Sequence, residues 1–305
     1  MLIRNYEIKM LLAPLSEVTN TNFRILCREH GADLAFLPFV NVNALVMGDK
    51  VAWGWVKDSE REQALRAIQL FGSDAEMFRK SAWEISKIGL FDIIDINAAC
   101  PARKVVEDGA GGALLVEPRR LREIVKAVRE SFDGIVSVKL RLGYNKDSMQ
   151  EVAAAIGGIV EFATIHGRTV KQGYSGKSDW EAINKAKKLF SCPIVGNGDI
   201  RSKKDYLMVK DKVDAVMIGR AALKNPLLFN EIKSNKETDR KKSAVACLSW
   251  GCESEESLLL LKRFCTSFVS GLKGSREMKE KICRCKSVKE TKAYVKKIIA
   301  SLQEK

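Results

Sequence analysis

Eight short apolar runs, each followed by a stretch whose apolar residues have helical spacing, occupy the chain up to about residue 235. The runs are rich in β-branched residues, which is typical of buried strands. Strands that alternate with amphipathic helices form a parallel sheet covered by helices. We therefore expect strands at Lys9–Ala13, Asp33–Val40, Ala67–Phe71, Ile93–Asn97, Ile135–Arg141, Ile159–His166, Pro193–Asn197 and Ala215–Gly219.

The number of repeats narrows the fold. Eight such units in this length match a TIM (β/α)8 barrel, which typically has about 250 residues. A doubly wound open sheet is the alternative, although it usually has fewer repeats. The sequence contains neither G-x-G-x-x-G after the first strand nor G-x-x-x-x-G-K-[ST], so both common nucleotide fingerprints are missing. Helices are expected at Ser73–Lys87, Pro118–Glu130, Ser178–Leu189 and Ser202–Val209, the last two opening on a serine that can cap the first turn.

The C-terminal part of the chain has a different character. Residues 235–243 are polar without apolar periodicity and are expected to be a linker. Apolar residues then recur every three or four positions among many lysines and arginines, and residues 236–305 carry a net charge of +8. We expect a barrel domain over 1–234 and a small, basic, all-helical C-terminal domain over 244–305.

Charge and hydropathy restrict the class of protein. The net charge of the 305 residues is +14, which favours a polyanionic partner such as nucleic acid or an anionic surface, with a solubility surplus as the alternative. No apolar run approaches the roughly 20 residues that span a bilayer. The start of the chain has no long apolar segment of the secretory type. We expect a soluble, cytoplasmic protein with no membrane contact, and a monomer.

The eight cysteines are expected to be free thiols, because a chain in reducing surroundings rarely forms disulfides. Cys27 and Cys192 are interpreted as core residues. Five further cysteines lie between Cys247 and Cys285, but they lack the C-x2-C pairing of zinc ribbons. We expect no metal site, with a metal or iron–sulfur site on these five cysteines as the alternative.

Polar or glycine residues follow nearly every predicted strand, where the chemistry of a TIM barrel is found. Gly198 and Gly219 lie near the ends of the last two strands, where loops commonly bind phosphate and Arg220 would add positive charge; simple turns are the alternative. Lys139 could face a cofactor that gains negative charge, or pair with Asp95 or Glu161. The strand-end residues are Pro14, Ser16, Gln69, Asn97, Cys100, Lys139, Arg141, His166, Arg168, Asn197, Gly198, Asp199, Gly219 and Arg220.

Several longer motifs stand in one order along the chain. They are APLSEVTNTNFR from Ala13, DINAACP from Asp95, DGAGGALL from Asp108, VKLRLG from Val138, HGRTVKQGYSG from His166, GNGDI from Gly196 and MIGRAALKNP from Met217. Together they resemble the tRNA-dihydrouridine synthases over about residues 10–230. The basic tail is similar to the tRNA-binding domain of that family in length and character only.

The resemblance implies FMN-dependent reduction of the C5–C6 double bond of particular uridines in tRNA, with NADPH (or NADH) as reductant. It implies that Cys100 gives a proton to C5 while hydride from flavin N5 reaches C6; a thiol with an ordinary pKa near 8.5 is protonated at neutral pH. Together with their places at the strand ends, the resemblance implies that Asn97, Arg141 and Arg168 contact the substrate. Cofactor contacts are expected at Pro14, Ser16, Gln69, Lys139, His166, Asn197, Gly198, Asp199, Gly219 and Arg220.

Two departures and two alternatives accompany this reading. Ala99 stands where the family usually has glycine, and Leu15 where methionine is common. A dihydroorotate- or dihydropyrimidine-type FMN barrel acting on a free base is the first alternative, although it has no need of a basic helical tail. An RNA-binding protein that keeps the fold without chemistry is the second, and the presence of Cys100, Lys139 and His166 argues against it.

Overall fold

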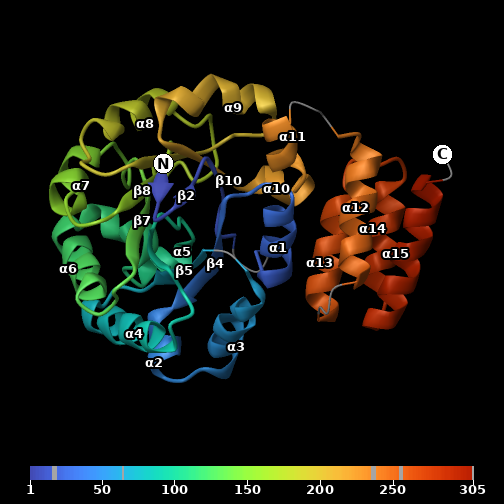
Figure 1. Cartoon of the computed structure of the whole chain (residues 1–305), viewed down its shortest axis with the longest axis horizontal. Helices are drawn as coiled ribbons and strands as arrows, with labels where there is room; N and C mark the ends of the chain where they lie inside the picture. The colour runs from blue at the N-terminus through green and yellow to red at the C-terminus, as the bar shows by residue number, and fades with distance from the viewer. Residues whose placement is uncertain (16–18, 64, 235–237, 254–256, 304–305) are drawn as a thin grey trace.

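The computed structural model describes residues 1–15, 19–63, 65–234, 238–253 and 257–303 (Figure 1). Eight parallel strands close into a barrel in the order β10-β3-β4-β5-β6-β7-β8-β9, so the predicted TIM barrel is confirmed. An antiparallel hairpin of β1 (Leu2–Ile3) and β2 (Tyr6–Glu7) precedes it. The barrel strands are β3 (Met10–Leu12), β4 (Leu34–Asn41), β5 (Arg66–Phe71), β6 (Ile93–Ala98), β7 (Ile135–Arg141), β8 (Phe162–His166), β9 (Ile194–Asn197) and β10 (Ala215–Ile218).

Side chains alternate between the inside of the barrel and the layer of helices around it. Leu11, Phe36, Ile93 and Phe162 belong to the interior cluster, whereas their chain neighbours pack against the helices. Ile3 and Ile8 of the hairpin join this interior cluster. Apolar residues thus fill the barrel interior towards the amino ends of the strands. The polar residues that line the cavity lie towards the carboxyl ends.

The helices begin where a side chain can accept from the exposed N–H groups of the first turn. Ser202 caps α9 as expected, by accepting from the N–H of Asp205. The expected cap by Ser178 is wrong: Asp179, the next residue, accepts from Ala182 N and begins α8. The barrel helices are α1 (Thr21–Glu29), α2 (Val42–Val46), α3 (Lys50–Asp58), α4 (Ala75–Ile88), α5 (Arg103–Glu107), α6 (Pro118–Arg129), α7 (Met149–Ile156), α8 (Trp180–Lys187), α9 (Lys203–Val209), α10 (Arg220–Lys224) and α11 (Leu228–Ser234), with short 3₁₀ helices at Ser59–Arg61, Gly111–Val116 and Lys210–Lys212.

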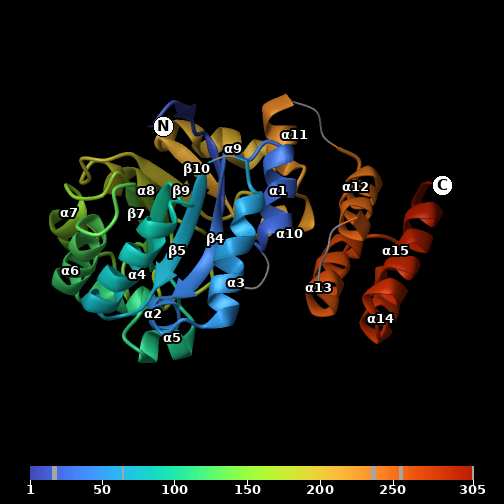
Figure 2. The ribbon, with the colours of Figure 1, turned by 60° about the horizontal axis from the view of Figure 1, so that its bottom comes forward.

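A group of four helices follows the barrel and lies beside it, as both ribbon views show (Figures 1 and 2). Its first helix begins at Arg240, inside the segment expected to be a linker, because the Asp239 carboxylate accepts from the N–H groups of Lys241 and Lys242. Residues 235–237 of the expected linker lie outside the described residues. The four helices are α12 (Arg240–Glu253), α13 (Leu258–Val269), α14 (Ser275–Arg284) and α15 (Val288–Gln303).

Aromatic rings join the helical domain to the barrel. The Phe23 ring of α1 lies 6.3 Å from the ring of Phe264 and 6.4 Å from that of Phe268, both on α13. Near the start of α12, Ser243 donates to the Asn225 side chain at 2.7 Å, and Asn225 donates to Glu231 at 3.0 Å. The packing of these helices on the barrel therefore combines aromatic contact with a small polar network.

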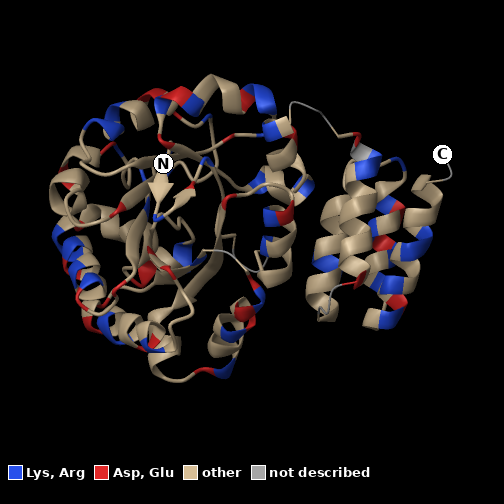
Figure 3. Ribbon diagram, in the orientation of Figure 1, with Lys and Arg blue, Asp and Glu red and all other residues tan. Residues whose placement is uncertain are grey.

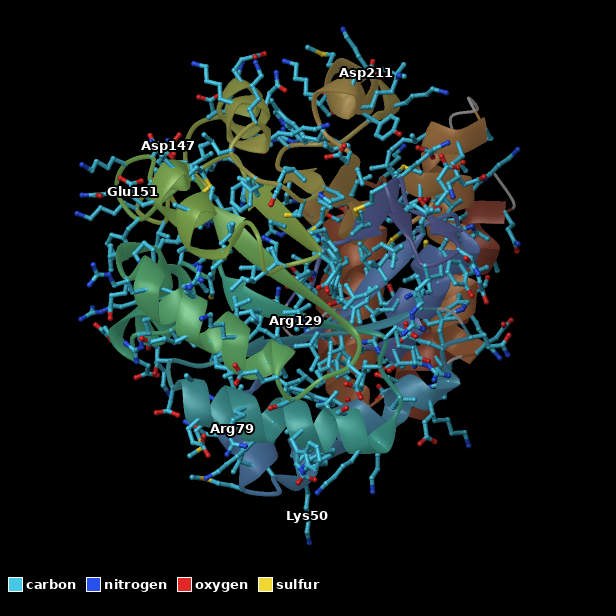
Figure 4. All side chains as sticks on the ribbon, turned by 60° about the vertical axis from the view of Figure 1, so that its left-hand side comes forward. Lys50, Arg79, Arg129, Asp147, Glu151 and Asp211 are labelled. Atoms are coloured by element: carbon cyan, nitrogen blue, oxygen red, sulfur yellow. The ribbon has the colours of Figure 1, made fainter. Side chains whose placement is uncertain are left out.

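Lysines and arginines alternate with acidic residues along the helices around the barrel, and they recur along the four C-terminal helices (Figure 3). Side chains such as Lys50 and Glu151 project away from the outer helices (Figure 4). In the described part of the chain, no helix combines the length and the apolar character needed to cross a membrane. All eight cysteines are free thiols, and no three metal-binding side chains of His, Cys, Asp or Glu gather among the described residues.

Candidate active site

A cavity of about 830 Å³ opens at the carboxyl ends of the barrel strands. Its walls come from the ends of the strands and the loops that follow them, which is where TIM barrels carry their chemistry. Arg168 is absent from the lining, and Ser16 lies outside the described residues, so its role stays a prediction. The expected site residues that line the cavity are Pro14, Gln69, Asn97, Cys100, Lys139, Arg141, His166, Asn197, Gly198, Asp199, Gly219 and Arg220.

The side chain of Asn97 holds the backbone of the loop that carries Cys100. The Asn97 Oδ1 atom accepts from the backbone N–H of Ala99 at 3.1 Å and of Cys100 at 3.0 Å. The loop carbonyls are held as well, since Arg141 Nε donates to Ala99 O at 2.9 Å and Gly112 N donates to Cys100 O at 3.0 Å. The backbone of the half-buried Cys100 is thus held at the cavity wall through both its N–H and its carbonyl.

The glycine-rich segment has a packing role next to this loop. A Cβ at Gly111 would lie 3.0 Å from Cys100 Cβ, and a Cβ at Gly112 would lie 2.6 Å from Val170 Cγ2. Gly111 also has a φ of +56°, which favours glycine. Ala99 causes no strain, because Arg4 and Asp199 are the only non-glycine residues with positive φ in the described part of the chain. The Ala99 departure therefore leaves the loop backbone in an ordinary conformation.

Positive charge dominates the deepest part of the cavity. Burial, and next the neighbouring Arg141, lowers the pKa of Lys139 to about 8. Burial also lowers the pKa of His166 to about 2, with Lys139 and Arg141 among the surrounding cations, so its imidazole is neutral. Asp95 lies below these groups and accepts from Gln69 and Ser137, while Glu161 pairs with Arg129. Both acids considered as partners of Lys139 are thus engaged elsewhere, although the charge of Asp95 raises the pKa of Lys139.

Arg168 supports the wall from behind. Arg168 is 1% exposed, and its guanidinium donates to Asp199 Oδ2 at 2.6 Å and to the carbonyl of Gly176 at 2.6 Å. It also lies 3.1 Å from His166 Nε2. Because arginine has no acceptor, Nε2 must accept this hydrogen bond, and the proton of the neutral ring is on Nδ1. Arg168 therefore sets the tautomer of His166 and holds the Asp199 carboxylate.

The other end of the cavity is shaped by the loops after β9 and β10. Gly198 has a φ of +130°, and Asp199 has a φ of +58°. A Cβ at Gly198 would lie 2.2 Å from Ser178 Oγ, whereas a Cβ at Gly219 would only touch the Ala13 Cβ at 3.6 Å. Glycine at 219 therefore keeps space free in the cavity. Arg220 lies beside that space and 3.6 Å from Asp199 Oδ1.

Several lining residues were not singled out in the sequence. Tyr174 is the clearest: its ring lies 4.4 Å from the Arg220 guanidinium carbon and 5.6 Å from that of Arg141. Tyr174 stands inside one of the motifs but in a loop, and loop residues give no periodic signal. The other lining residues outside the expected set include Phe39, Arg201, Lys224 and Asn225.

Comparison with known proteins assigns the family. The profile of the dihydrouridine synthase (Dus) family matches residues 11–304. This chain belongs to the dihydrouridine synthase family. A "Probable tRNA-dihydrouridine synthase" of Aquifex aeolicus is 34% identical over 297 residues, covering 92% of this chain and 93% of its own. The tRNA-dihydrouridine synthase B of Pasteurella multocida is 35% identical over 253 residues, covering 78% of this chain and 74% of its own.

Solved structures of lower identity share the fold. Morphinone reductase has a TM-score of 0.54 at 15% identity, with 76% of this chain and 87% of that chain covered. Histamine dehydrogenase from Rhizobium sp. 4-9 has a TM-score of 0.59 at 14% identity, with 81% and 48% covered. The barrel mouth described above is thus the candidate active site of a dihydrouridine synthase family enzyme.

Proposed function

We propose that this chain is an FMN-dependent tRNA-dihydrouridine synthase that reduces uridines in tRNA with NADPH as the reductant. The observation that carries the proposal is that one cavity holds an anchored thiol, Cys100, together with Lys139 and the neutral His166. The names of the curated relatives support the reaction and the tRNA substrate.

The residues of the cavity fit FMN. A flavin phosphate needs cations and free space, and Arg220 and Arg201 line the same cavity as Gly219. The isoalloxazine ring needs polar partners, and the Gln69 amide, Lys139 and His166 lie at the deep end. When bound, FMN supplies the hydride from N5 that reaches C6 of the uracil. Pro14, Ser16, Asn197, Gly198 and Asp199 complete the expected cofactor contacts.

The protein's own groups account for the other requirements of the reaction. The Cys100 thiol, which lines the cavity, donates a proton to C5 of the uracil as the general acid. Lys139 stabilises negative charge at the deep end, since its ammonium lies half-buried where charge interactions are strong. Asn97 and Arg141 lie on either side of the Cys100 loop and contact the substrate, and Arg168 acts through His166 and Asp199.

The tRNA is proposed to bind across both domains. A base inside a folded RNA is reached only after it turns out of its stack, and the cavity mouth would receive it. Exposed lysines and arginines of α14, α15 and the segment between them would neutralise tRNA phosphates. These residues are Arg276, Lys281, Arg284, Lys286, Lys289, Lys296 and Lys297.

The test is direct. The protein is incubated with FMN, NADPH and unmodified tRNA, and dihydrouridine is measured by mass spectrometry, with NADH in a parallel sample. Product in tRNA and none with free uracil or orotate supports the proposal, and the reverse pattern supports the free-base alternative. Light scattering with and without tRNA tests whether the protein is the expected monomer. The proposed location is the cytoplasm, because the proposed substrate is tRNA.

A further inference from the structure

A continuous chain of side-chain hydrogen bonds runs from the middle of the barrel to the loop of Cys100. Gln69 Nε2 donates to Asp95 Oδ2 at 2.5 Å, and Asn97 Nδ2 donates to Gln69 Oε1 at 2.7 Å. Asn97 Oδ1 then accepts from the N–H groups of Ala99 and Cys100. Ser137 Oγ donates to the other oxygen of Asp95 at 2.6 Å.

All three links of this chain are buried: Gln69 is 0%, Asp95 1% and Asn97 4% exposed. Water therefore cannot easily replace a link, and each amide must find its partners within the protein. Three neighbouring strands, β5, β6 and β7, supply the members, so the barrel itself fixes their spacing.

The donor-to-acceptor direction of this hydrogen-bond chain depends on Asp95, its first member. An amide can point its oxygen or its NH2 group towards a neighbour, and a chain of two amides can run either way. An ionised carboxylate only accepts, so it forces Gln69 to present its NH2 group to Asp95 and its oxygen to Asn97. Asn97 must in turn present its NH2 group to Gln69 and its oxygen to the loop.

The opposite direction would be incompatible with the loop. An Asn97 NH2 group turned towards Ala99 and Cys100 would face two N–H donors and satisfy neither. The other two anchors, Arg141 and Gly112, bind loop carbonyls and cannot accept from these N–H groups. Among the described contacts, the amide oxygen of Asn97 alone satisfies them.

The groups around Asp95 keep it an acceptor at neutral pH. It is faced by Gln69 from β5, and by Ser137 and Lys139 from β7. Burial raises the pKa of its carboxyl to about 6, while the hydrogen bonds of Gln69 and Ser137 and the charge of Lys139 act the other way. At pH 7 and above the carboxylate is therefore ionised.

We propose that Asp95 is a positioning residue whose carboxylate, through Gln69 and Asn97, fixes the place of Cys100 at the cavity wall. Asp95 itself donates no proton to the substrate. The consequence for turnover rests on the proposed function, whereas the consequence for the Cys100 loop holds for the protein alone.

The test uses the FMN-loaded enzyme and the isosteric variant Asp95→Asn, whose side chain can donate as well as accept and so no longer forces Gln69 to present its NH2 group. Each sample is treated with iodoacetamide, and alkylation is measured at Cys100 and at the exposed Cys283 by peptide mass spectrometry. We expect the ratio of Cys100 to Cys283 alkylation to rise about threefold or more. We also expect flavin reduction by NADPH to stay within about threefold, while reoxidation of the reduced flavin by tRNA slows about tenfold at an unchanged KM for tRNA.

Glu161→Gln is the matched control, because it makes the same carboxyl-to-amide change on this barrel but outside the hydrogen-bond chain of Asp95, Gln69 and Asn97. Its alkylation ratio and reoxidation rate should equal those of the wild type. Ser137→Ala removes one donor but leaves the direction fixed, and it should give a smaller change than Asp95→Asn. If Asp95→Asn does not fold, the wild type carries the test: its alkylation ratio should rise as the pH falls from 7 to 5.

The outcomes separate the two proposals. An alkylation ratio and a reoxidation rate at wild-type values in folded Asp95→Asn overturn the positioning role, and so does a flat ratio from pH 7 to 5 if the variant does not fold. A shifted ratio in a protein that makes no dihydrouridine leaves the positioning role standing and overturns the proposed function. If the wild type forms dihydrouridine and Asp95→Asn keeps the wild-type alkylation ratio and reoxidation rate, the proposed function stands and the positioning role is overturned.

Discussion

Arg141 holds the backbone of Ala99: its Nε donates to the Ala99 carbonyl at 2.9 Å, directly before Cys100. The same guanidinium donates through Nη1 to the carbonyls of Thr169 at 2.9 Å and Gly173 at 2.7 Å. Arg141 is the last residue of β7, so a rigid strand joins the Cys100 loop to the loop that carries Tyr174. One buried side chain thus sets the spacing of two loops at the cavity mouth.

Replacement of Arg141 by lysine should loosen both loops. Lysine keeps the charge but lacks the planar fork that reaches three carbonyls at once. We expect the free energy of unfolding to fall by about 1.5–3 kcal/mol, the range for hydrogen bonds to charged groups. Turnover with tRNA should fall about tenfold or more, measured alongside urea unfolding. Arg122→Lys is the control, since Arg122 makes a single exposed contact with Ala155 O; equal losses in both variants would contradict the special role of Arg141.

Replacement of Cys100 by alanine should separate the two half-reactions. Only the proton donor is removed, so FMN binding and flavin reduction by NADPH should stay within about twofold. Dihydrouridine formation should fall by about 100-fold or more, the usual contribution of a positioned general acid. Stopped-flow absorbance of the flavin measures both steps. Cys283→Ala, which removes the exposed thiol of α14, should change neither, and near-wild-type turnover in Cys100→Ala would show that another group supplies the proton.

The neutral state of His166 predicts a pH dependence of stability. The folded pKa is about 2, below the ordinary 6.5, so the unfolded chain binds the proton first as the pH falls. The contribution of His166 to stability is therefore complete above pH 6.5 and is lost progressively below it. We expect wild type to lose about 1.4 kcal/mol per pH unit more than His166→Asn between pH 6 and 4. Denaturant unfolding of both proteins across this range measures the difference.

An NMR titration checks the same state directly. His30 is the second of the two histidines in the sequence, so two imidazole signals are expected. The His166 signal should stay constant between pH 8 and 5, with the proton on Nδ1. A midpoint for His166 above pH 5 would contradict the burial and the surrounding cations as the cause of its neutral state.

The barrel was predictable because its strands are apolar runs with β-branched residues, and seven of the eight expected ranges lie within about two residues of the observed ends. The eighth, Ile159–His166, is shorter in the structure, where β8 begins at Phe162. Local competition explains the misplaced helix starts. Asp179 caps α8 in place of Ser178, because an aspartate one residue away offers an equally good acceptor. Asp239 starts α12 inside the expected linker, because its carboxylate accepts from the N–H groups of the first turn.

The site was predictable where it depends on strand ends, since parallel strands bring their carboxyl ends to one edge. Its finer arrangement depends on loop backbone that carries no periodic signal. Arg168 lies behind the cavity wall because it donates to the carbonyls of Ser175 and Gly176. The Tyr174 ring lies against the guanidinium groups of Arg141 and Arg220. The buried Asp95 was considered only as a partner of Lys139, because the amide chain above it appears only once three strands are placed side by side.

Removal of charge from α15 should weaken tRNA binding without changing the barrel. Lys289 and Lys296 are exposed and two helical turns apart, so they lie on one face. For the double change to glutamine we expect the slope of log Kd against log salt to fall by about 1 to 2, since each lysine that neutralises a phosphate adds about 1 to the slope. NADPH-dependent flavin reduction should be unchanged. The matched control is Lys185→Gln with Lys188→Gln, exposed lysines at the C-terminal end of α8, a barrel helix that lies apart from α12–α15 (Figure 1). Equal salt slopes in the two double variants would place the tRNA-binding surface away from this face of α15.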